Sequence, residues 1–585
     1  MKIDLSGESD LLVRHREWLD EIARDLRRPF TEFIERLSEP YGRNIDWWVT
    51  PVASRNTFAS SLFFQCCQLM LARRIAQSDP GVREITVDSP ALARTLRNAL
   101  AIRRGDVRVH ARQGRWRGGL KLLARMAFRL VAACFRCLGQ ATFARIHAAR
   151  STVPLQHGLI LIDTFLYSDS LDQAYRDRHY PGLAECLGPA ERGRVFFVPT
   201  YYRIRNYSRL FRRLRRSETN FLIKEDYLRW RDYGFALAHP FRLLRFRVDS
   251  CDFQGIEVAP LVNDALMESF ASSGTIEGLL RYRFARRLAE RGVRVKLAID
   301  WFENQELDHG SNAGLREFLP ETVVVGYQGF VVPKTYLCLF PTRQEAALRL
   351  VPHKVAVMGP ALATGPREFC PDIDVIVAPA FRFTSIGQER RATPRTGPLT
   401  ILVPLPFLDR ESEHILSLLG AALSLLARPE RKRWRVLVKP HPIAGAAHVT
   451  ASLRNSTRSG FEIVSGDIEG LLRNADVLVS NASSVCVHSL VCGVPVAVIG
   501  NSRGLTQNPI PDWVENHMWA LCHSAEDLGS ALDRLARRDE ATLQRYHTAA
   551  HALREGCVEP VTPETVARFL GLEAAPVTTA PGVAR

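Results

Sequence analysis

Short apolar runs alternate with helical periods through the last third of the chain. From Leu399 onward the runs have strand length, and the segments between them place apolar residues three or four positions apart, as helices do. Alternating strands and helices predict a parallel, doubly wound sheet. The expected strands are 399–403, 434–438, 461–464, 476–479 and 494–499, and the expected helices are 411–427, 467–474, 485–491, 525–537 and 540–553.

The first two thirds show the same alternation less cleanly. We expect a first strand–loop–helix unit from a strand at 45–49, a loop at 50–57 and a helix at 60–75. Further strands are expected at 85–87, 107–110, 158–165, 195–199, 293–299, 322–326, 355–358 and 375–378, and further helices at 11–37, 274–292 and 310–318. The pattern therefore predicts an α/β protein with two Rossmann-like halves.

Length and composition divide the chain further. A chain of 585 residues is too long for one hydrophobic core, so more than one domain is expected. We assign an N-terminal domain to residues 1–381, a linker to 382–398 and a C-terminal domain to 399–571. The Ala-, Pro- and Thr-rich segment 572–585 is expected to be disordered.

Basic residues gather in two segments of the N-terminal half, 113–149 and 203–247. The chain carries a net charge of +16, which indicates an anionic partner. In the first segment five cations fall on one stripe of an otherwise apolar helix: Arg117, Lys121, Arg125, Arg129 and Arg136. This pattern suits an anionic membrane surface, whereas a core helix with a solvated Arg face is the alternative. We expect no nucleic acid, because no nucleic-acid motif accompanies these segments.

The chain shows neither a signal peptide nor a run of about 18 apolar residues, so we expect a cytoplasmic protein without a membrane span. Metal sites are also not expected. Cys134 and Cys137 form a lone C-x-x-C pair, and the D-x-D at Asp372–Asp374 runs into an apolar strand. No cofactor is predicted.

Two polar loops follow strands of the C-terminal half. The first is Lys439-Pro440-His441-Pro442, and the second is Ser480–Ser484, which opens into a helix. Ligands bind at this edge of open α/β sheets, and hydroxyls at a helix start favour a phosphate. We therefore predict a nucleotide-phosphate site from Lys439, His441, Asn481, Ser483 and Ser484. A structural histidine in a proline turn is the alternative.

These motifs resemble the GT-B glycosyltransferases of bacterial surface-polysaccharide (capsule and O-antigen) synthesis. Lys439–Pro442 is similar to the His-Pro motif of bacterial sialyl-, Kdo- and glycerophosphate transferases, and Ser480–Val485 with Gly493–Val496 is similar to their Ser-Ser loop. The resemblance covers about 399–520. It implies that His441, Ser483 and Ser484 hold the phosphate of a nucleotide sugar, with a CMP-linked keto sugar favoured over UDP-sugars and CDP-glycerol.

The N-terminal half resembles a bacterial surface-carbohydrate biosynthesis family in 46–48, 54–56, 303–305 and 326–328. An inverting transfer needs a base for the acceptor hydroxyl. Glu303 is the first candidate and Asp300 the second, with a helix cap or salt bridge as the alternative for either. Arg55 is a candidate for binding the acceptor or a phosphate, or it forms a structural ion pair.

We expect a glycosyltransferase that moves a sugar onto a surface glycan or lipid-linked glycan at the inner face of the cytoplasmic membrane. A nucleotide-sugar epimerase and a non-catalytic, membrane-peripheral scaffold are the alternatives.

Overall fold

The computed structural model describes residues 1–101, 106–112, 115–148, 158–171, 175–383, 397–406, 409–425, 434–441, 460–481 and 483–572, with the side chains of residues 101 and 115–121 left aside. Pro442, Ala482, most of the expected linker and the expected tail from residue 573 lie outside these ranges. Within them the chain forms three parallel sheets and a short antiparallel hairpin.

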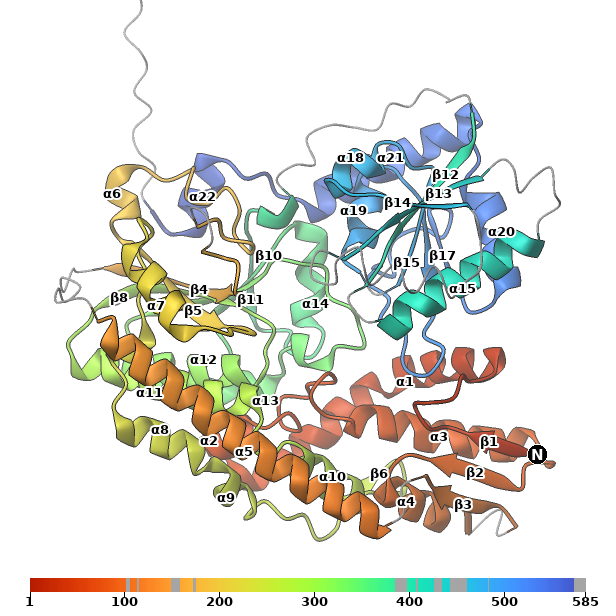
Figure 1. Cartoon of the computed structure of the whole chain (residues 1–585), viewed down its shortest axis with the longest axis horizontal. Helices are drawn as coiled ribbons and strands as arrows, with labels where there is room; N and C mark the ends of the chain where they lie inside the picture. The colour runs from red at the N-terminus through yellow and green to blue at the C-terminus, as the bar shows by residue number, and fades with distance from the viewer. Residues whose placement is uncertain are drawn as a thin grey trace, which may run out of the picture.

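A small sheet opens the chain, where the sequence predicted only two of its strands. Its order is β1-β2-β3, all parallel, and α1, α3 and α4 pack around it. The bounds are β1 Lys2–Asp4, α1 Val13–Ser38, α3 Leu62–Ser78, β2 Glu84–Val87, α4 Pro90–Ala101 and β3 Arg108–Ala111. In Figure 1 this red and brown unit lies below the C-terminal half.

The second sheet has six parallel strands in the order β11-β10-β9-β8-β4-β5. Its strands are β4 Leu159–Leu166, β5 Val195–Tyr201, β8 Val295–Trp301, β9 Val323–Gln328, β10 Lys354–Val357 and β11 Asp374–Val377. The strand order reverses between β4 and β8, which makes the carboxyl ends of these two strands the switch point where ligands bind in such sheets.

The helices of the following region are α5 Arg115–Ile146, α6 Pro189–Arg192, α7 Tyr207–Arg216, α8 Trp230–Leu237, α9 His239–Leu243, α10 Ala259–Glu268, α11 Ser273–Glu290, α12 Glu306–Phe318, α13 Arg343–Ala347 and α14 Thr364–Arg367. Helix α10 and the hairpin of β6 Asp252–Phe253 and β7 Ile256–Glu257 pack on the core of the first unit. Helices α11 and α12 pack closely because Gly278 and Gly310 meet there, with no room for a Cβ at either position.

The third sheet has the order β14-β13-β12-β15-β16-β17, again all parallel. This order is the 3-2-1-4-5-6 arrangement of dinucleotide-binding folds. Its elements are β12 Leu399–Pro404, α15 Asp409–Leu425, β13 Trp434–Lys439, β14 Phe461–Ile463, α18 Ile468–Leu472, β15 Val477–Ser480, α19 Val485–Val491, β16 Val496–Ile499, β17 Trp519–Cys522, α20 Ala525–Leu535 and α21 Glu540–Cys557. The predicted α/β class with two Rossmann-like halves is confirmed.

The predicted strand at 45–49 is wrong. Residues Ile45–Trp48 form the short helix α2, and the Asn44 side chain caps it by accepting from the Asp46 N–H at 3.1 Å. Both indoles are buried, with Trp47 donating to Ser38 Oγ and Trp48 to the Gly42 carbonyl. A run of large apolar residues does not distinguish a buried strand from a buried helical turn.

Among the contacts that join the halves, two lie at opposite ends of their boundary. Helix α22, Pro563–Phe569, packs on the N-terminal sheet, where the Phe569 ring lies 5.4 Å from Tyr327 and 5.9 Å from Phe381. At the other end, Asp10 bonds Ser502 Oγ at 3.0 Å and Arg503 Nε at 2.7 Å. Residues assigned by sequence to one domain therefore pack on the other at both places.

No helix in the described ranges combines the length and the apolar composition that crossing a bilayer requires.

Candidate active site

The two predicted phosphate loops flank the carboxyl end of strand β12. Lys439 ends β13 on one side, where its carbonyl accepts from the Leu405 N–H at 3.0 Å. Ser480 ends β15 on the other side, and its hydroxyl donates to the Pro404 carbonyl at 3.1 Å. The serine loop therefore lies at the switch point, because β12 and β15 are the strands between which the order reverses, and the His-Pro loop lies next to it on the other side of β12.

The side chains of the His-Pro loop are only partly buried. Lys439, Pro440 and His441 are each intermediate in exposure. Burial and the neighbouring Lys439 charge lower the pKa of His441. A neutral imidazole can donate one hydrogen bond to a phosphate oxygen and accept another from a hydroxyl.

The serine loop leads directly into α19. Ser484 is its N-cap residue, but its side chain makes no capping hydrogen bond. Ser483 Oγ accepts from the Val485 N–H at 3.3 Å. His488 follows Ser484 by one turn on the same face, and its ring lies 4.7 Å from Phe383 of the N-terminal half. Burial, with the charge of Arg382, lowers the pKa of His488 to about 4.

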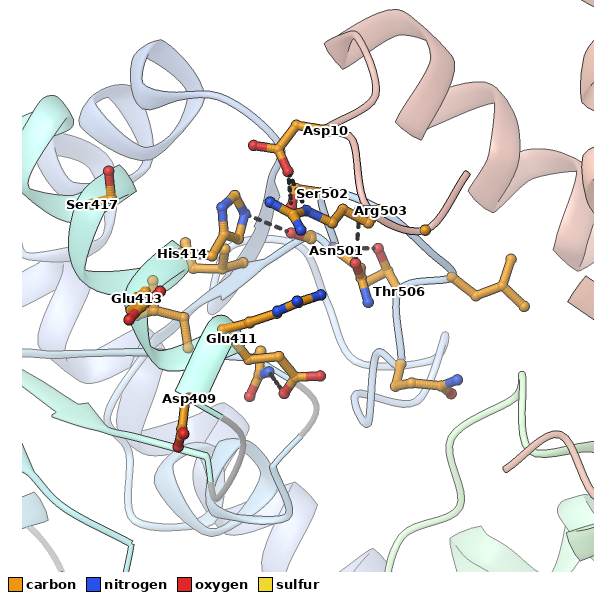
Figure 2. A pocket seen from close by; sticks show the side chains of 18 residues that line it. Asp10, Asp409, Glu411, Glu413, His414, Ser417, Asn501, Ser502, Arg503 and Thr506 are labelled. Atoms are coloured by element: carbon orange, nitrogen blue, oxygen red, sulfur yellow. Dashed lines mark hydrogen bonds and ion pairs between the residues drawn. The ribbon is translucent and has the colours of Figure 1, made fainter. Parts of the chain in front are cut away.

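Next to the serine loop is a cavity of about 740 Å³ at the carboxyl edge of the third sheet. Glu411 accepts from Asn481 Nδ2 at 2.7 Å inside it. The Nε2 atom of His414 lies 3.3 Å from the carbonyl oxygen of Gly500. Figure 2 shows His414 of α15 beside Asp10, Asn501 and Arg503, with Glu411 on the same helix below them. The cavity thus combines carboxylates with amide and hydroxyl groups, which suits a ligand rich in hydroxyls.

Glu303 follows β8 at the switch point of the N-terminal sheet. Its carboxylate accepts from Trp301 Nε1 at 3.1 Å and from Gln305 Nε2 at 2.6 Å. Burial raises the pKa of Glu303, although the Trp301 bond and the Arg382 charge oppose the shift. A raised carboxyl pKa and a position at the sheet edge fit the predicted general base.

Asp300, the second candidate base, lies inside strand β8 and not in the predicted loop that follows it. It is buried and accepts from Asn312 Nδ2 of α12 at 3.0 Å. Burial and the nearby Asp163 charge raise its pKa to about 7. Because alternate strand residues point to opposite faces, Asp300 lies under α12, on the face opposite Trp301. This position favours a structural role over proton transfer to a substrate.

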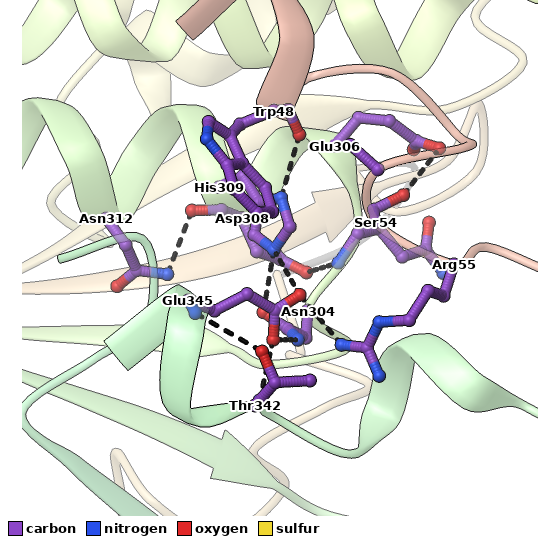
Figure 3. Close-up of polar contacts among 12 residues, drawn as sticks. Trp48, Ser54, Arg55, Asn304, Glu306, Asp308, His309, Asn312, Thr342 and Glu345 are labelled. Atoms are coloured by element: carbon purple, nitrogen blue, oxygen red, sulfur yellow. Dashed lines mark hydrogen bonds and ion pairs between the residues drawn. The ribbon is translucent and has the colours of Figure 1, made fainter. Parts of the chain in front are cut away.

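Arg55 and Asn304 of the N-terminal motifs meet Glu345 and His309 in one buried polar network, the Arg55 network (Figure 3). Arg55 pairs with Glu345 at 2.7 Å and also donates to the carbonyls of Leu337 and Phe340. Asn304 donates to the other Glu345 oxygen at 3.2 Å, and its own amide oxygen lies 3.1 Å from His309 Nε2.

This network holds strained backbone beside Glu303. Arg55 has φ of 55° and Asn304 has φ of 53°, the left-handed region that L-residues rarely occupy. Since Asn304 directly follows Glu303, the hydrogen bonds that fix Asn304 also set where the Glu303 carboxylate lies. The guanidinium of Arg55 is enclosed by these partners, which favours the structural alternative for this residue.

Arg382 was not predicted as a site residue, because the sequence assigned it to the start of the linker. The positive charge of Arg382 opposes the rise in the pKa of Glu303 and adds to the fall in the pKa of His488, so Arg382 lies near a group of each half. Its neighbours are fixed by ring contacts, Phe381 with Tyr180 and Phe383 with His488. No local pattern marks an arginine at a domain junction as functional. The Glu411 carboxylate was missed as well, because an acid in the first turn of a helix is ordinary.

In the described part of the chain no three His, Cys, Asp or Glu side chains gather in a way that could hold a metal ion. Asp372 and Asp374 of the D-x-D point to Arg343 at 3.6 Å and Lys354 at 2.9 Å. Cys134 is exposed and Cys137 is buried, on one surface helix.

No protein-family model matches this chain, and no curated protein matches it in sequence. Solved structures with a similar arrangement include a trehalose 6-phosphate synthase from Burkholderia multivorans (11% identity, TM-score 0.39, covering 71% of this chain and 96% of that one). MurG from Acinetobacter baumannii also has a similar arrangement (14% identity, TM-score 0.40, covering 71% of this chain and 99% of that one). A third is CalG4, the calicheamicin glycosyltransferase (13%, TM-score 0.39, 72% and 100%). At these values the likeness carries no argument about chemistry, and the fold stands on the strand order.

Proposed function

We propose that the protein is a glycosyltransferase that moves a sugar from a nucleotide donor onto a glycan acceptor. The observation that carries the proposal is the pair of polar loops flanking the end of β12, with the serine pair at the switch point of a nucleotide-binding type of sheet and Lys439 and His441 on the other side of β12. Glu303 occupies the equivalent edge of the other sheet.

In this reaction the acceptor hydroxyl oxygen bonds to the anomeric carbon while the bond from that carbon to the donor phosphate oxygen breaks. Glu303 takes the hydroxyl proton in an inverting transfer. Lys439, His441 and the Ser483 and Ser484 hydroxyls stabilise the negative charge on the departing phosphate by charge and hydrogen bonding. Arg382 adds a positive charge where the halves meet.

The cavity beside Asn481 suits the nucleoside. Its volume of about 740 Å³ lies within the range of small-molecule sites. Glu411 and Asn481 supply an acceptor and a donor for ribose hydroxyls and base edges. The motif resemblance supports a CMP-linked keto sugar as the donor.

A second cavity, of about 320 Å³, supports an acceptor between the halves. Phe330 and Val331 of the N-terminal half line it on one side, and Ile510 and Trp513 of the C-terminal half line it on the other. The Phe330 ring lies 5.7 Å from Trp301, whose indole donates to Glu303. This cavity is lined mainly by apolar residues, which suits the less polar part of a lipid-linked surface glycan, presented at the inner face of the cytoplasmic membrane.

Thermal shift with CMP, CDP, UMP, UDP and GDP tests the proposal. We expect one nucleotide to raise the Tm of the wild type, and His441→Ala to remove that shift. His551→Ala, an exposed histidine of α21, is the matched control and should respond as wild type. If no nucleotide stabilises the wild type, the protein is no nucleotide-sugar enzyme and a scaffold is favoured. Donor turnover without an acceptor would indicate an epimerase.

A further inference from the structure

An apolar stripe runs along the outward side of helix α5, which crosses the surface of the N-terminal half (Figure 1, orange). Phe128, Val131, Phe135 and Leu138 are 73%, 52%, 71% and 52% exposed. Their spacing of three, four and three residues puts them on one face. The opposite face, with Ala133, Cys137 and Ala141, is buried against Tyr233 and Ala236 of α8.

The exposed stripe differs from the one that the sequence predicted. Two arginines of the expected basic stripe are turned toward the protein: Arg129 donates to the Glu268 carbonyl, and Arg136 lies near enough to Glu277 to lower its pKa. Arg125 remains exposed at the edge of the apolar stripe. The face that meets solvent is therefore apolar at its centre and basic at its border.

More exposed apolar side chains border α5. Phe241 of α9 and Leu244 at its C-terminal end are 59% and 55% exposed. Phe241 packs on Phe270, two residues after the Glu268 that Arg129 contacts. At the other end Trp230 is 54% exposed, with the Arg145 guanidinium 4.5 Å from its ring. Contiguous apolar surface of this kind marks an interaction site.

We infer that this face of α5 docks on an anionic lipid bilayer, with the aromatic stripe entering the headgroup region and the arginines contacting lipid phosphates. The 32-residue helix has seven basic residues and no acidic one. A second copy of the chain would bring the same charge against it and be repelled, whereas an anionic membrane complements it. The membrane location of the proposed reaction rests on this face, but the chemistry at His441 and Glu303 does not, so the two proposals fail separately.

Co-sedimentation of the full chain with vesicles of phosphatidylcholine, alone or mixed with phosphatidylglycerol, tests the inference. We expect binding to the anionic vesicles, weakened by salt, and a loss of about tenfold or more in the Phe128→Glu, Phe135→Glu double variant, because each phenyl ring leaves the apolar phase. Leu425→Glu, at an equally exposed site on α15, should bind as wild type. Equal binding by the double variant and wild type, or no wild-type binding, would overturn the inference.

A second readout uses the native surface. Of the twelve cysteines, all within the described residues, only Cys134 is exposed, and it lies on α5 beside Phe135. An environment-sensitive fluorophore on Cys134 should shift to the blue with anionic vesicles. An unchanged spectrum would count against docking. A dimer in solution that the double variant separates would assign the face to a second copy instead.

Discussion

The motif residues of the two halves differ in what they contact. In the N-terminal half, Arg55 and Asn304 are buried, and both bond the carboxylate of Glu345, which lies outside the motifs. In the C-terminal half, Lys439, His441 and Ser484 are partly exposed, and Ser484 leaves its helix without a side-chain cap. Similar residue types thus serve an internal framework in one half and an accessible loop in the other.

The comparison shows that polar residues in a motif can have either a structural role or a ligand-binding role. A buried network fixes backbone geometry, and here it fixes the turn that carries Glu303. Partly exposed side chains at a sheet edge have hydrogen-bonding capacity to offer a ligand. Changes in the first group should therefore alter folding, and changes in the second should alter binding and turnover.

The largest effect is expected at Glu303, the proposed base, whose position is set by the buried network. Glu303→Gln keeps the size of the side chain and one of its two accepted hydrogen bonds, since the amide oxygen can still accept from Trp301 Nε1. The amide cannot take the acceptor proton, so kcat should fall about 10²- to 10⁴-fold. Nucleotide-induced thermal shifts should stay as in wild type. Glu321→Gln, an exposed glutamate in the same half, is the control. Full activity in Glu303→Gln would remove this residue from the reaction.

Arg55→Met should act on stability instead. The substitution leaves the Glu345 carboxylate buried without its cation, and such a loss costs about 3–5 kcal/mol of unfolding free energy. Urea unfolding measures it. Arg435→Met removes a half-exposed partner of Glu462 and should unfold close to wild type. A stable Arg55→Met protein with weakened acceptor binding would support the ligand role over the structural one.

Acid should weaken the same network in a defined range. Burial alone would raise the pKa of Glu345, but Arg55 and His309 outweigh it and lower the pKa to about 2 from a usual value of 4.5. The ionised carboxylate therefore stabilises the fold fully above pH 4.5, and this contribution disappears as the pH falls toward 2, about 3 kcal/mol in all. The unfolding free energies of wild type and Glu345→Gln should become equal as the pH falls through that range. A difference between them that does not change with pH would contradict the lowered pKa of Glu345.

The smallest effect is expected in the cavity of the C-terminal half. Glu411→Gln removes the charged acceptor beside Asn481, and nucleotide affinity should fall about tenfold with little change in Tm without ligand. Titration calorimetry with the stabilising nucleotide checks this, with Glu526→Gln of α20 as the control. Unchanged affinity would move the nucleoside out of this cavity.

Strands and helices with a regular hydrophobic pattern could be predicted from the sequence. Features that depend on contacts between residues far apart in the chain could not. Buried parallel strands such as Val496–Ile499 are continuous apolar runs, so both large sheets could be placed. Strand β1 was missed because Lys2–Asp4 is short and polar. Ile45–Trp48 became a helix through a cap and two indole bonds to distant groups. Arg382 gains its position from Phe383 meeting His488, a pair about a hundred residues apart that no local pattern contains.

The two contacts at opposite ends of the domain boundary affect how the two halves can move relative to each other. A hinge about most axes would pull Phe569 from Tyr327 or separate Asp10 from Ser502 and Arg503. Only a rotation about the line that joins the two contacts would keep both. The contacts therefore restrict the directions in which the halves can open, so ligand exchange would depend in part on side chains and loops around the cavities.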